Sequence, residues 1–142
     1  SHPPLYFSGL RDPKRSANRI AKYNLSGWIG INDTADELAG WRGPIQHELD
    51  AMGHPDAMDG LELCSMYWFV ITDADTDQTP MGKGSNILVG TKQQITDNLV
   101  RLKEVGLTMP LLWPPFVDVP VAKTLDDMRV LKEEILPIVE SA

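Results

Sequence analysis

The chain has 142 residues, a length that suits one domain with a hydrophobic core. Its formal net charge of −7 argues against nucleic acid or an anionic membrane as the main partner, because both select basic surfaces. Cys64 is the only cysteine, which excludes an internal disulfide and favours a reducing, cytoplasmic location. The longest apolar run, Met66 to Ile71, is far shorter than the roughly 20 residues that cross a bilayer.

The first part of the chain predicts two strand–helix units. Short apolar runs at Leu5–Phe7 and Trp28–Ile31 predict strands, and Pro13–Tyr23 predicts a helix with proline in its first turn. Thr34 and Glu37 have the spacing of a capping box, so a second helix should begin there. Gly43–Pro44 predicts a kink in that helix or a division into two consecutive helices.

The middle of the chain predicts a long strand and a long loop. Leu63–Thr72 is rich in aromatic and β-branched residues, as strands are. Asp73–Ser85 has no periodicity and is expected to be irregular.

Two more helices are predicted after this loop. Thr91 and Gln94 suggest a capping box, Ile95 to Val105 keeps helical spacing, and Gly106 is expected to end the helix. Leu107–Trp113 predicts a buried strand, although it contains Pro110. Thr124 is the expected cap of the last helix. Its predicted buried stripe is Leu125, Met128, Leu131 and Ile135.

Four strand–helix units in succession predict a parallel sheet covered by helices. Four units are half of an eight-stranded barrel, so we expect residues 1–142 to form a single α/β domain with a half-barrel architecture. An open α/β domain of flavodoxin type is the alternative, but it usually has five strands. In a barrel the functional residues lie on the loops after the strands. Those loops are Ser8–Arg11, Ile31–Thr34, Thr72–Ser85 and Trp113–Phe116.

The sequence resembles the C-terminal half of the luciferase-like, flavin-dependent monooxygenases. The segments that carry the resemblance are HPPLYFSGL, RIAKYNLSGWIGI, ILVGTKQQITDNLVRLKEVGL and LDDMRVLKEEILPIVE, which span nearly all of the chain in family order. The resemblance implies a TIM barrel that binds FMN or a deazaflavin. Ser26 replaces the aspartate that usually precedes the glycine–tryptophan turn, and the four N-terminal units of the barrel are absent. A second chain is therefore expected, either an N-terminal half or a second copy in an oligomer.

The main candidate site is the loop Phe7–Ser8–Gly9–Leu10–Arg11. A strand that ends in a glycine loop before a helix presents free N–H groups and the positive end of the helix dipole to an anion. Arg11 adds a guanidinium group that suits phosphate. The resemblance implies that this loop contacts the flavin phosphate. The alternative is a tight turn with a solvated arginine.

Five further residues lie at the same expected end of the barrel. Asn32, Gly90 and Thr91 are candidate cofactor contacts, and Trp113 and Phe116 are candidate substrate contacts. Helix capping alone would also explain Thr91, and core packing would explain the aromatic residues.

The sequence gives little support for other kinds of functional site. His2, His47 and His54 lack metal-ligand spacing and are expected at the surface. Asp73, Asp75 and Asp77 alternate like calcium ligands, but the glycine and glutamate of an EF-hand loop are missing. Cys64 is expected to be a buried apolar residue. No acid–base pair stands out, and flavin enzymes need none in the protein, because the flavin supplies the chemistry. The resemblance therefore implies part of a flavin-dependent oxidoreductase that acts on a small organic substrate. The alternative is a non-catalytic half-barrel that binds flavin or a partner chain.

Overall fold

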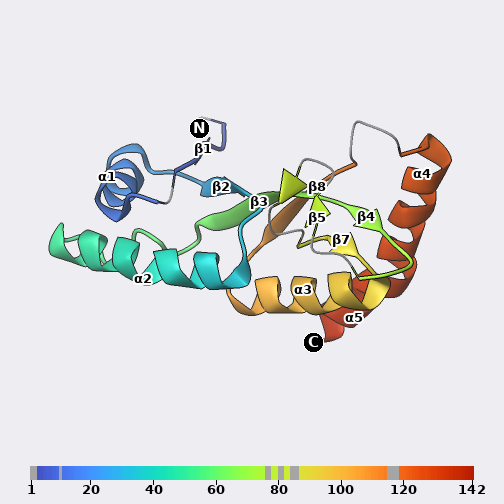
Figure 1. Ribbon diagram of the computed structural model, residues 1–142. Helices are drawn as coiled ribbons and strands as arrows, with labels where there is room; N and C mark the ends of the chain where they lie inside the picture. Colours follow the sequence, from blue (N-terminus) through green and yellow to red (C-terminus); the bar gives the residue numbers. More distant parts are fainter. Residues whose placement is uncertain (1–2, 10, 76–77, 80–81, 84–86, 115–118) are drawn as a thin grey trace.

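The computed structural model describes residues 3–9, 11–75, 78–79, 82–83, 87–114 and 119–142. Its main sheet has four parallel strands in the order β1-β2-β3-β8, and helices flank it (Figure 1). The strands are β1 (Tyr6–Phe7), β2 (Gly27–Ile31), β3 (Glu62–Trp68) and β8 (Met109–Trp113). The first three helices in the chain are α1 (Pro13–Tyr23), α2 (Ala35–Ala51) and α3 (Lys92–Glu104). This architecture confirms the predicted half of a TIM barrel.

Local sequence signals set the ends of these helices. Asp12 caps α1 by accepting a hydrogen bond from the Arg15 N–H at 3.0 Å. Thr34 and Glu37 form the predicted capping box at the start of α2. The helix α2 continues through Pro44, so of the two alternatives the division into two helices is wrong and the kink stays a prediction. Gly106, with φ of +92°, follows the end of α3, where a left-handed residue is favourable.

The predicted strand Leu63–Thr72 is two strands. The Phe69 N–H donates to the Trp113 carbonyl at 3.0 Å, and the chain then leaves the main sheet. Strand β4 (Val70–Ile71) pairs in parallel with β7 (Val89–Gly90), which leads into α3. The expected irregular loop also contains the antiparallel pair β5 (Gln78–Thr79) and β6 (Gly82–Lys83).

The last helical region differs most from the prediction. Helix α4 (Val121–Val130) begins after Pro120, so Thr124 is not its cap. A π-helix η1 (Leu131–Ile135) and α5 (Leu136–Ser141) continue the chain. In the expected buried stripe, Leu131 and Ile135 are buried, whereas Leu125 is 66% and Met128 is 48% exposed. The first turns of this region therefore lack the expected packing.

Side chains of α4 hold strand β4 at its free edge. Asp127 is 3% exposed, and its carboxylate accepts a hydrogen bond from the Ile71 N–H at 3.2 Å. Lys123 donates to the Ile71 carbonyl at 2.8 Å and also pairs with Asp127. Both backbone polar groups of Ile71 are thus satisfied by α4.

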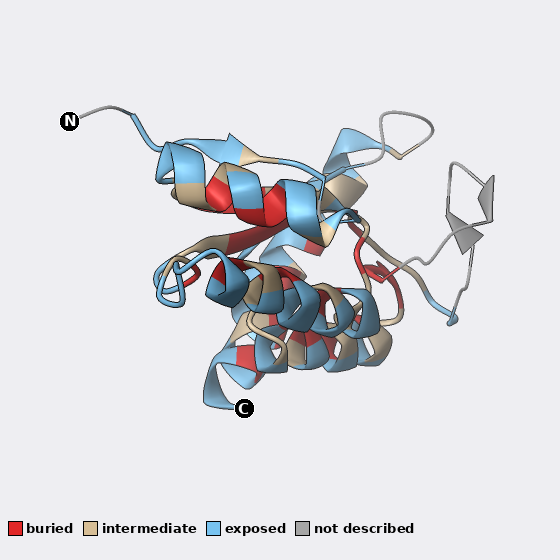
Figure 2. Cartoon of the chain, turned by 90° about the vertical axis from the view of Figure 1, so that its left-hand side faces the viewer, coloured by how far each residue is buried: buried red, intermediate tan, exposed pale blue. Residues whose placement is uncertain are grey.

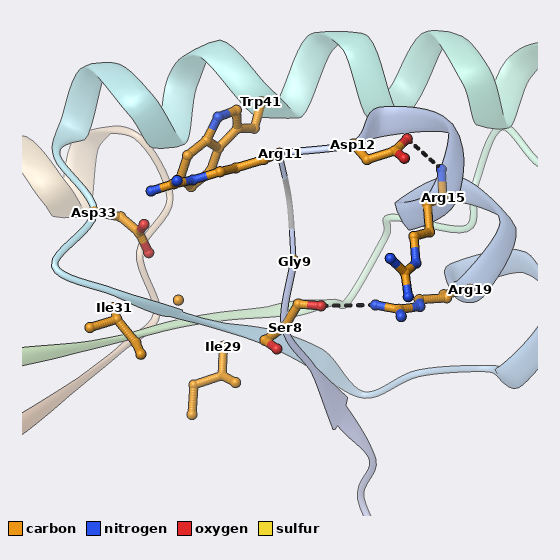
Figure 3. A pocket seen from close by; sticks show the side chains of 11 residues that line it. Ser8, Gly9, Arg11, Asp12, Arg15, Arg19, Ile29, Ile31, Asp33 and Trp41 are labelled. Atoms are coloured by element: carbon orange, nitrogen blue, oxygen red, sulfur yellow. Dashed lines mark hydrogen bonds between the residues drawn. The ribbon is translucent and has the colours of Figure 1, made fainter.

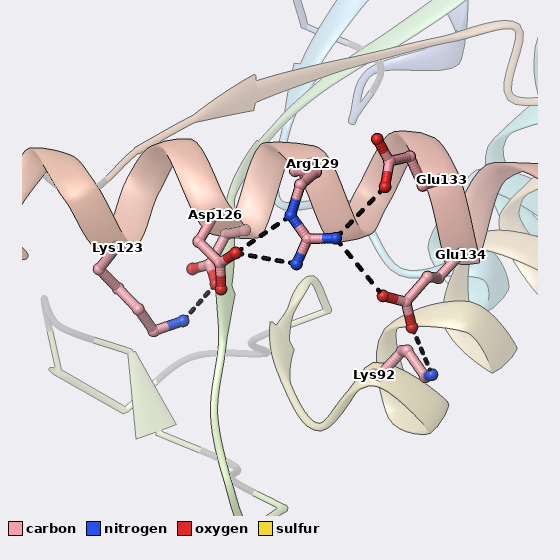
Figure 4. A network of polar contacts seen from close by, with 7 residues as sticks. Lys92, Lys123, Asp126, Arg129, Glu133 and Glu134 are labelled. Carbon is pink, nitrogen blue, oxygen red and sulfur yellow. Dashed lines mark hydrogen bonds and ion pairs between the residues drawn. The ribbon is translucent and has the colours of Figure 1, made fainter.

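Surface charges connect the last helices with each other and with α3 (Figure 4). Arg129 pairs with Asp126 at 2.9 Å and with Glu133 at 3.2 Å. Glu134 pairs with Lys92 at the start of α3, at 2.8 Å. These side chains are about half exposed, so solvent screens each pair and its contribution to stability is small.

The two faces of the main sheet have different environments. Trp28, Leu63 and Tyr67 face the helices, belong to the hydrophobic core and are 3%, 7% and 1% exposed. Buried residues lie on the strands and on the sides of the helices that face them (Figure 2). Alternate residues of the same strands point to the other face, where Ile31 is 69% and Trp113 is 42% exposed. This inner face includes Ile29, Ile31, Met66, Trp68, Leu111 and Trp113, and the strand register places Cys64 and Met109 beside Ile29.

Candidate functional site

A pocket of about 530 Å³ lies at the carboxyl end of β2, next to the point where β1 stops. Strand β1 pairs only as far as Phe7 with Trp28, so among the described residues no strand lies beside the following residues of β2 on that edge. The loop after β1, the start of α1 and Trp41 of α2 complete the walls (Figure 3). The volume falls within the range typical of small-molecule sites.

Three arginines give the pocket a positive wall. Arg11 comes from the loop after β1, and Arg15 and Arg19 come from α1 (Figure 3). Arg19 donates to the Ser8 carbonyl at 3.0 Å, which fixes the loop against the helix. Guanidinium groups offer several N–H donors in a plane, so this wall can bind an anion such as a phosphate.

The loop itself is held by buried contacts. Gly9 has φ of +105°, a conformation that glycine adopts without strain. The Ser16 hydroxyl, on a fully buried residue of α1, donates to the Gly9 carbonyl at 2.9 Å. The backbone at Ser8 and Gly9 is thus positioned before any ligand binds, which lowers the entropy that binding must offset.

Asp33 supplies a carboxylate to the pocket, a role that its place in the expected loop Ile31–Thr34 did not single out. It is 7% exposed, and its carboxylate accepts a hydrogen bond from the Ser65 hydroxyl at 2.8 Å. Burial raises the pKa of the Asp33 carboxyl, while the Ser65 hydrogen bond and the Arg11 charge oppose this shift. Its place just after a strand, at the carboxyl end of the sheet, was the available signal.

Gly30 makes room for Asp33. A Cβ at position 30 would lie 1.6 Å from the Asp33 Oδ2, so a larger residue would displace the carboxylate. Tyr67 adds a further hydrogen bond, from its hydroxyl to the Asp33 carbonyl at 2.9 Å. Burial raises the pKa of the Tyr67 hydroxyl, which therefore remains a donor at neutral pH.

The structure brings together part of the predicted site. Ser8, Gly9 and Arg11 line the pocket, whereas Phe7 packs against the core. Asn32 adjoins Asp33 in the turn after β2, with φ of +57°, and its N–H donates to the Met66 carbonyl at 2.8 Å. Leu10 and Phe116 lie outside the described residues.

The other predicted contacts lie away from this pocket. Gly90 ends β7, and Thr91 caps α3, as its alternative interpretation expected. The Thr91 hydroxyl also donates to the Asp75 carboxylate at 2.6 Å. Trp113 is on the inner face. Its ring packs edge to face against the ring of Trp68, with 6.2 Å between the two ring centroids.

Cys64 and two of the three histidines lie where the sequence predicts them. Cys64 is 2% exposed, and burial raises the pKa of its thiol, so it is a poor nucleophile. His47 and His54 are exposed, and His2 lies outside the described residues. Within the described ranges, no group of three or more potential ligands is placed to hold a metal ion. None of the helices described is both long enough and apolar enough to span a bilayer.

Comparison with known proteins supports the fold. The chain is similar to an F420-dependent secondary alcohol dehydrogenase solved in complex with an F420-acetone adduct, with a TM-score of 0.64. The two sequences are 16% identical, and the likeness covers 98% of this chain and 49% of that chain. This chain therefore spans about half of the solved one. No family model matches the sequence. No curated protein matches it significantly. The likeness supports the fold assignment, in which this chain corresponds to about half of a larger α/β protein.

Proposed function

We propose that this chain is the C-terminal half of a flavin-type oxidoreductase that oxidises a small organic substrate. The observation that carries the proposal is a pocket with three arginines at the carboxyl end of a half-barrel similar to an F420-dependent enzyme. A deazaflavin is the favoured cofactor because that enzyme binds one, and FMN is the other candidate. When bound, such a cofactor would accept or donate hydride, or in the case of FMN activate oxygen.

The donor set of the pocket fits the anionic end of such a cofactor. Arg11, Arg15 and Arg19 offer cationic donors, and Ser8 adds a hydroxyl group. Asp33, on the opposite side, can accept hydrogen bonds from hydroxyl groups of the ligand. The chain's own contribution would be to bind and orient the cofactor, in agreement with the interpretation of the loop Ser8–Arg11.

A second polypeptide is part of this proposal. The inner face is apolar and accessible, and β1 and β8 are the outer strands of the sheet. In a closed barrel, side chains from all strands fill this space in layers. Four further strand–helix units would cover the inner face and also pack near Leu125 and Met128 of α4. We propose that an N-terminal half or a second copy supplies them.

Titration of the 142-residue chain with FMN, and separately with F420, tests the cofactor site. Saturable quenching of cofactor fluorescence is the expected result. Arg11→Ala should weaken binding by about 1–3 kcal/mol if Arg11 makes a charge-assisted contact with phosphate. Lys14→Ala is the matched control, because Lys14 is a nearby cation that does not line the pocket. Equal affinities of wild type and Arg11→Ala would remove Arg11 from the site.

Sedimentation velocity tests the need for a second half. We expect the wild-type chain to self-associate, and Ile31→Asp together with Trp113→Asp to make it monomeric. Ala39→Asp places one of the same charges on the exposed surface of α2 and should leave association unchanged. A wild-type chain that is monomeric at all concentrations would contradict coverage of the inner face by a second copy.

The alternative function is a half-barrel without catalytic activity. Ser26, at the position of the family aspartate, has a structural role: its hydroxyl accepts a hydrogen bond from the Leu5 N–H at 3.2 Å. This observation favours a protein that binds a flavin or a partner chain without turnover. Substrate-dependent reduction of bound cofactor would exclude the alternative.

A further inference from the structure

The helices at the two ends of the main sheet carry opposite charges. Residues 11–22, which follow β1, contain five lysines and arginines and one acidic residue. Residues 121–141, which follow β8, contain five acidic residues and three lysines and arginines. Helices α1 and α4 lie at opposite ends of the molecule (Figure 1). Contact between the basic and the acidic helix therefore requires two copies of the chain.

Helix α4 also exposes an apolar stripe. Val121, Leu125 and Met128 are 75%, 66% and 48% exposed, and their spacing of four and three residues places them on one side of the helix. Asp126 and Glu133 lie farther around the helix, and both side chains are more than half exposed. An apolar stripe bordered by charges is typical of a helix that packs against another element.

The strand directions define how a second copy can close the sheet. All four strands of the main sheet are parallel, and β1 and β8 are its outer strands. Rotation by half a turn about an axis along the strands brings β8 of each copy beside β1 of the other, with all eight strands parallel. In such a barrel the helices that follow neighbouring strands lie side by side. Helix α4 of each copy is then the neighbour of α1 of the other, and the same contact occurs twice.

We propose that two copies of this chain form a two-fold symmetric barrel of eight strands, in which α1 of each copy packs beside α4 of the other. This inference rests on the proposed function, because it identifies the second polypeptide as a second copy. In this assembly the exposed side of α1, with Asn18 and Lys22 one turn apart, faces Asp126 and Glu133 of the other copy. Each chain has a net charge of −7, so unlike charges at this contact offset part of the repulsion and fix the relative position of the two copies.

The second copy also completes the pocket at the end of β2. That pocket lies beside the point at which β1 stops (Figure 3), and β8 of the second copy runs along the free edge of β1. The carboxyl ends of parallel strands meet at the same end of a barrel, so Trp113 of the second copy lies toward Ser8 and Gly9. In this assembly, both copies contribute to the candidate cofactor site.

Charge substitutions at the contact test the assembly. Asn18→Glu with Lys22→Glu makes the exposed side of α1 acidic, and Asp126→Lys with Glu133→Lys makes the facing side of α4 basic. In each double variant, the two sides of the contact then carry charges of the same sign. We expect each double variant to self-associate at least about tenfold more weakly than the wild-type chain, measured by sedimentation velocity.

A mixture of the two double variants is the decisive measurement. One variant supplies an acidic α1 and an acidic α4, and the other supplies a basic α1 and a basic α4, so both contacts of a mixed dimer regain unlike charges. We expect the mixture to associate within about threefold of the wild-type affinity, with a fluorescent label on one variant to identify mixed dimers. Unspecific association through the inner face would not distinguish the mixture from its components.

Matched controls place the same charges on α2 and α3. Ala39→Glu with Arg101→Glu, and Asp97→Lys with Glu104→Lys, alter exposed residues of these two helices. Each control should self-associate within about threefold of the wild-type chain, and mixing the controls should bring no gain. Circular dichroism verifies that each variant is folded. Lys22→Gln is the milder variant for the case that a double variant unfolds, and it should weaken self-association about threefold.

Equal losses in the variants and the controls, unchanged association of Lys22→Gln, or a mixture of folded variants that stays monomeric would overturn the proposal. A wild-type chain that is monomeric at all concentrations would also overturn it, and would leave a separate N-terminal half as the partner in the proposed function. Loss of FMN and F420 binding with the expected pattern of association would contradict only the proposed cofactor.

Discussion

The two faces of the main sheet differ although they are built from the same strands. In β2, Trp28 is 3% exposed on the helix-facing side, and Ile31, three residues later, is 69% exposed on the inner face. Both faces carry large apolar residues, so hydrophobicity alone does not separate them. The difference shows that the chain's own helices cover one face of the sheet and leave large apolar residues of the other face accessible, which is the face that the proposed second polypeptide would cover.

The largest effect expected from this comparison is on the helix-facing side. Leu63→Ala removes a residue that is 7% exposed in the core, and the cavity should lower the free energy of unfolding by about 2–5 kcal/mol. Ile31→Ala on the inner face should change the free energy of unfolding of the monomeric chain by no more than about 0.5 kcal/mol. Urea denaturation of both variants measures the difference. Equal losses would mean that the inner face is packed in solution.

A smaller effect on stability is expected at the N-terminus of α2. Thr34→Ala removes the side chain that accepts from the Glu37 N–H at 3.1 Å, and it should cost about 1 kcal/mol. Thr34→Ser keeps the hydroxyl group and serves as the control. Thermal unfolding followed by circular dichroism would show whether the two variants differ. Identical melting temperatures would show that the capping box does not stabilise α2.

The smallest effect is expected for the Asp33 carboxyl. It should be visible mainly as a pH dependence of the free energy of unfolding. Because the pKa of Asp33 is raised in the folded state, the stability it contributes is complete below its unfolded pKa and falls as the pH rises through the folded pKa. Asp33→Asn cannot ionise but keeps an acceptor for Ser65. The stability of this variant relative to wild type should therefore increase from about pH 3.5 upward, measured by urea denaturation at several pH values. A pH-independent difference would contradict burial of the charged carboxylate.

The sequence predicted the elements whose signals are local. The helix α1 has the predicted bounds, and the capping box at Thr34 and the glycine after α3 are confirmed. These features depend on residues within one turn of each other, so neighbouring chemistry determines them.

The errors concern contacts between distant segments. The alternation of residues 63–72 is the same whether Val70 pairs with β8 or with β7, so the break at Phe69 could not be predicted. Pro120 and Thr124 are both reasonable helix starts, and packing of α4 against Ile71 favours the earlier one. The site was predicted in part: Ser8, Gly9 and Arg11 line the pocket, whereas the role of Asp33 depends on Ser65 and Gly30, which the fold brings beside it.

The hydrogen bonds between α4 and the Ile71 backbone have a consequence for aggregation. A free strand edge offers N–H and C=O groups to any other strand, and intermolecular pairing at such edges leads to aggregation. At β4 these groups are already bonded to Asp127 and Lys123, so another chain would have to displace two side chains before it could pair there. The outer edge of β4 is thereby blocked as a template for aggregation, which leaves β1 and β8, the outer strands of the main sheet, as the edges at which the proposed barrel would close.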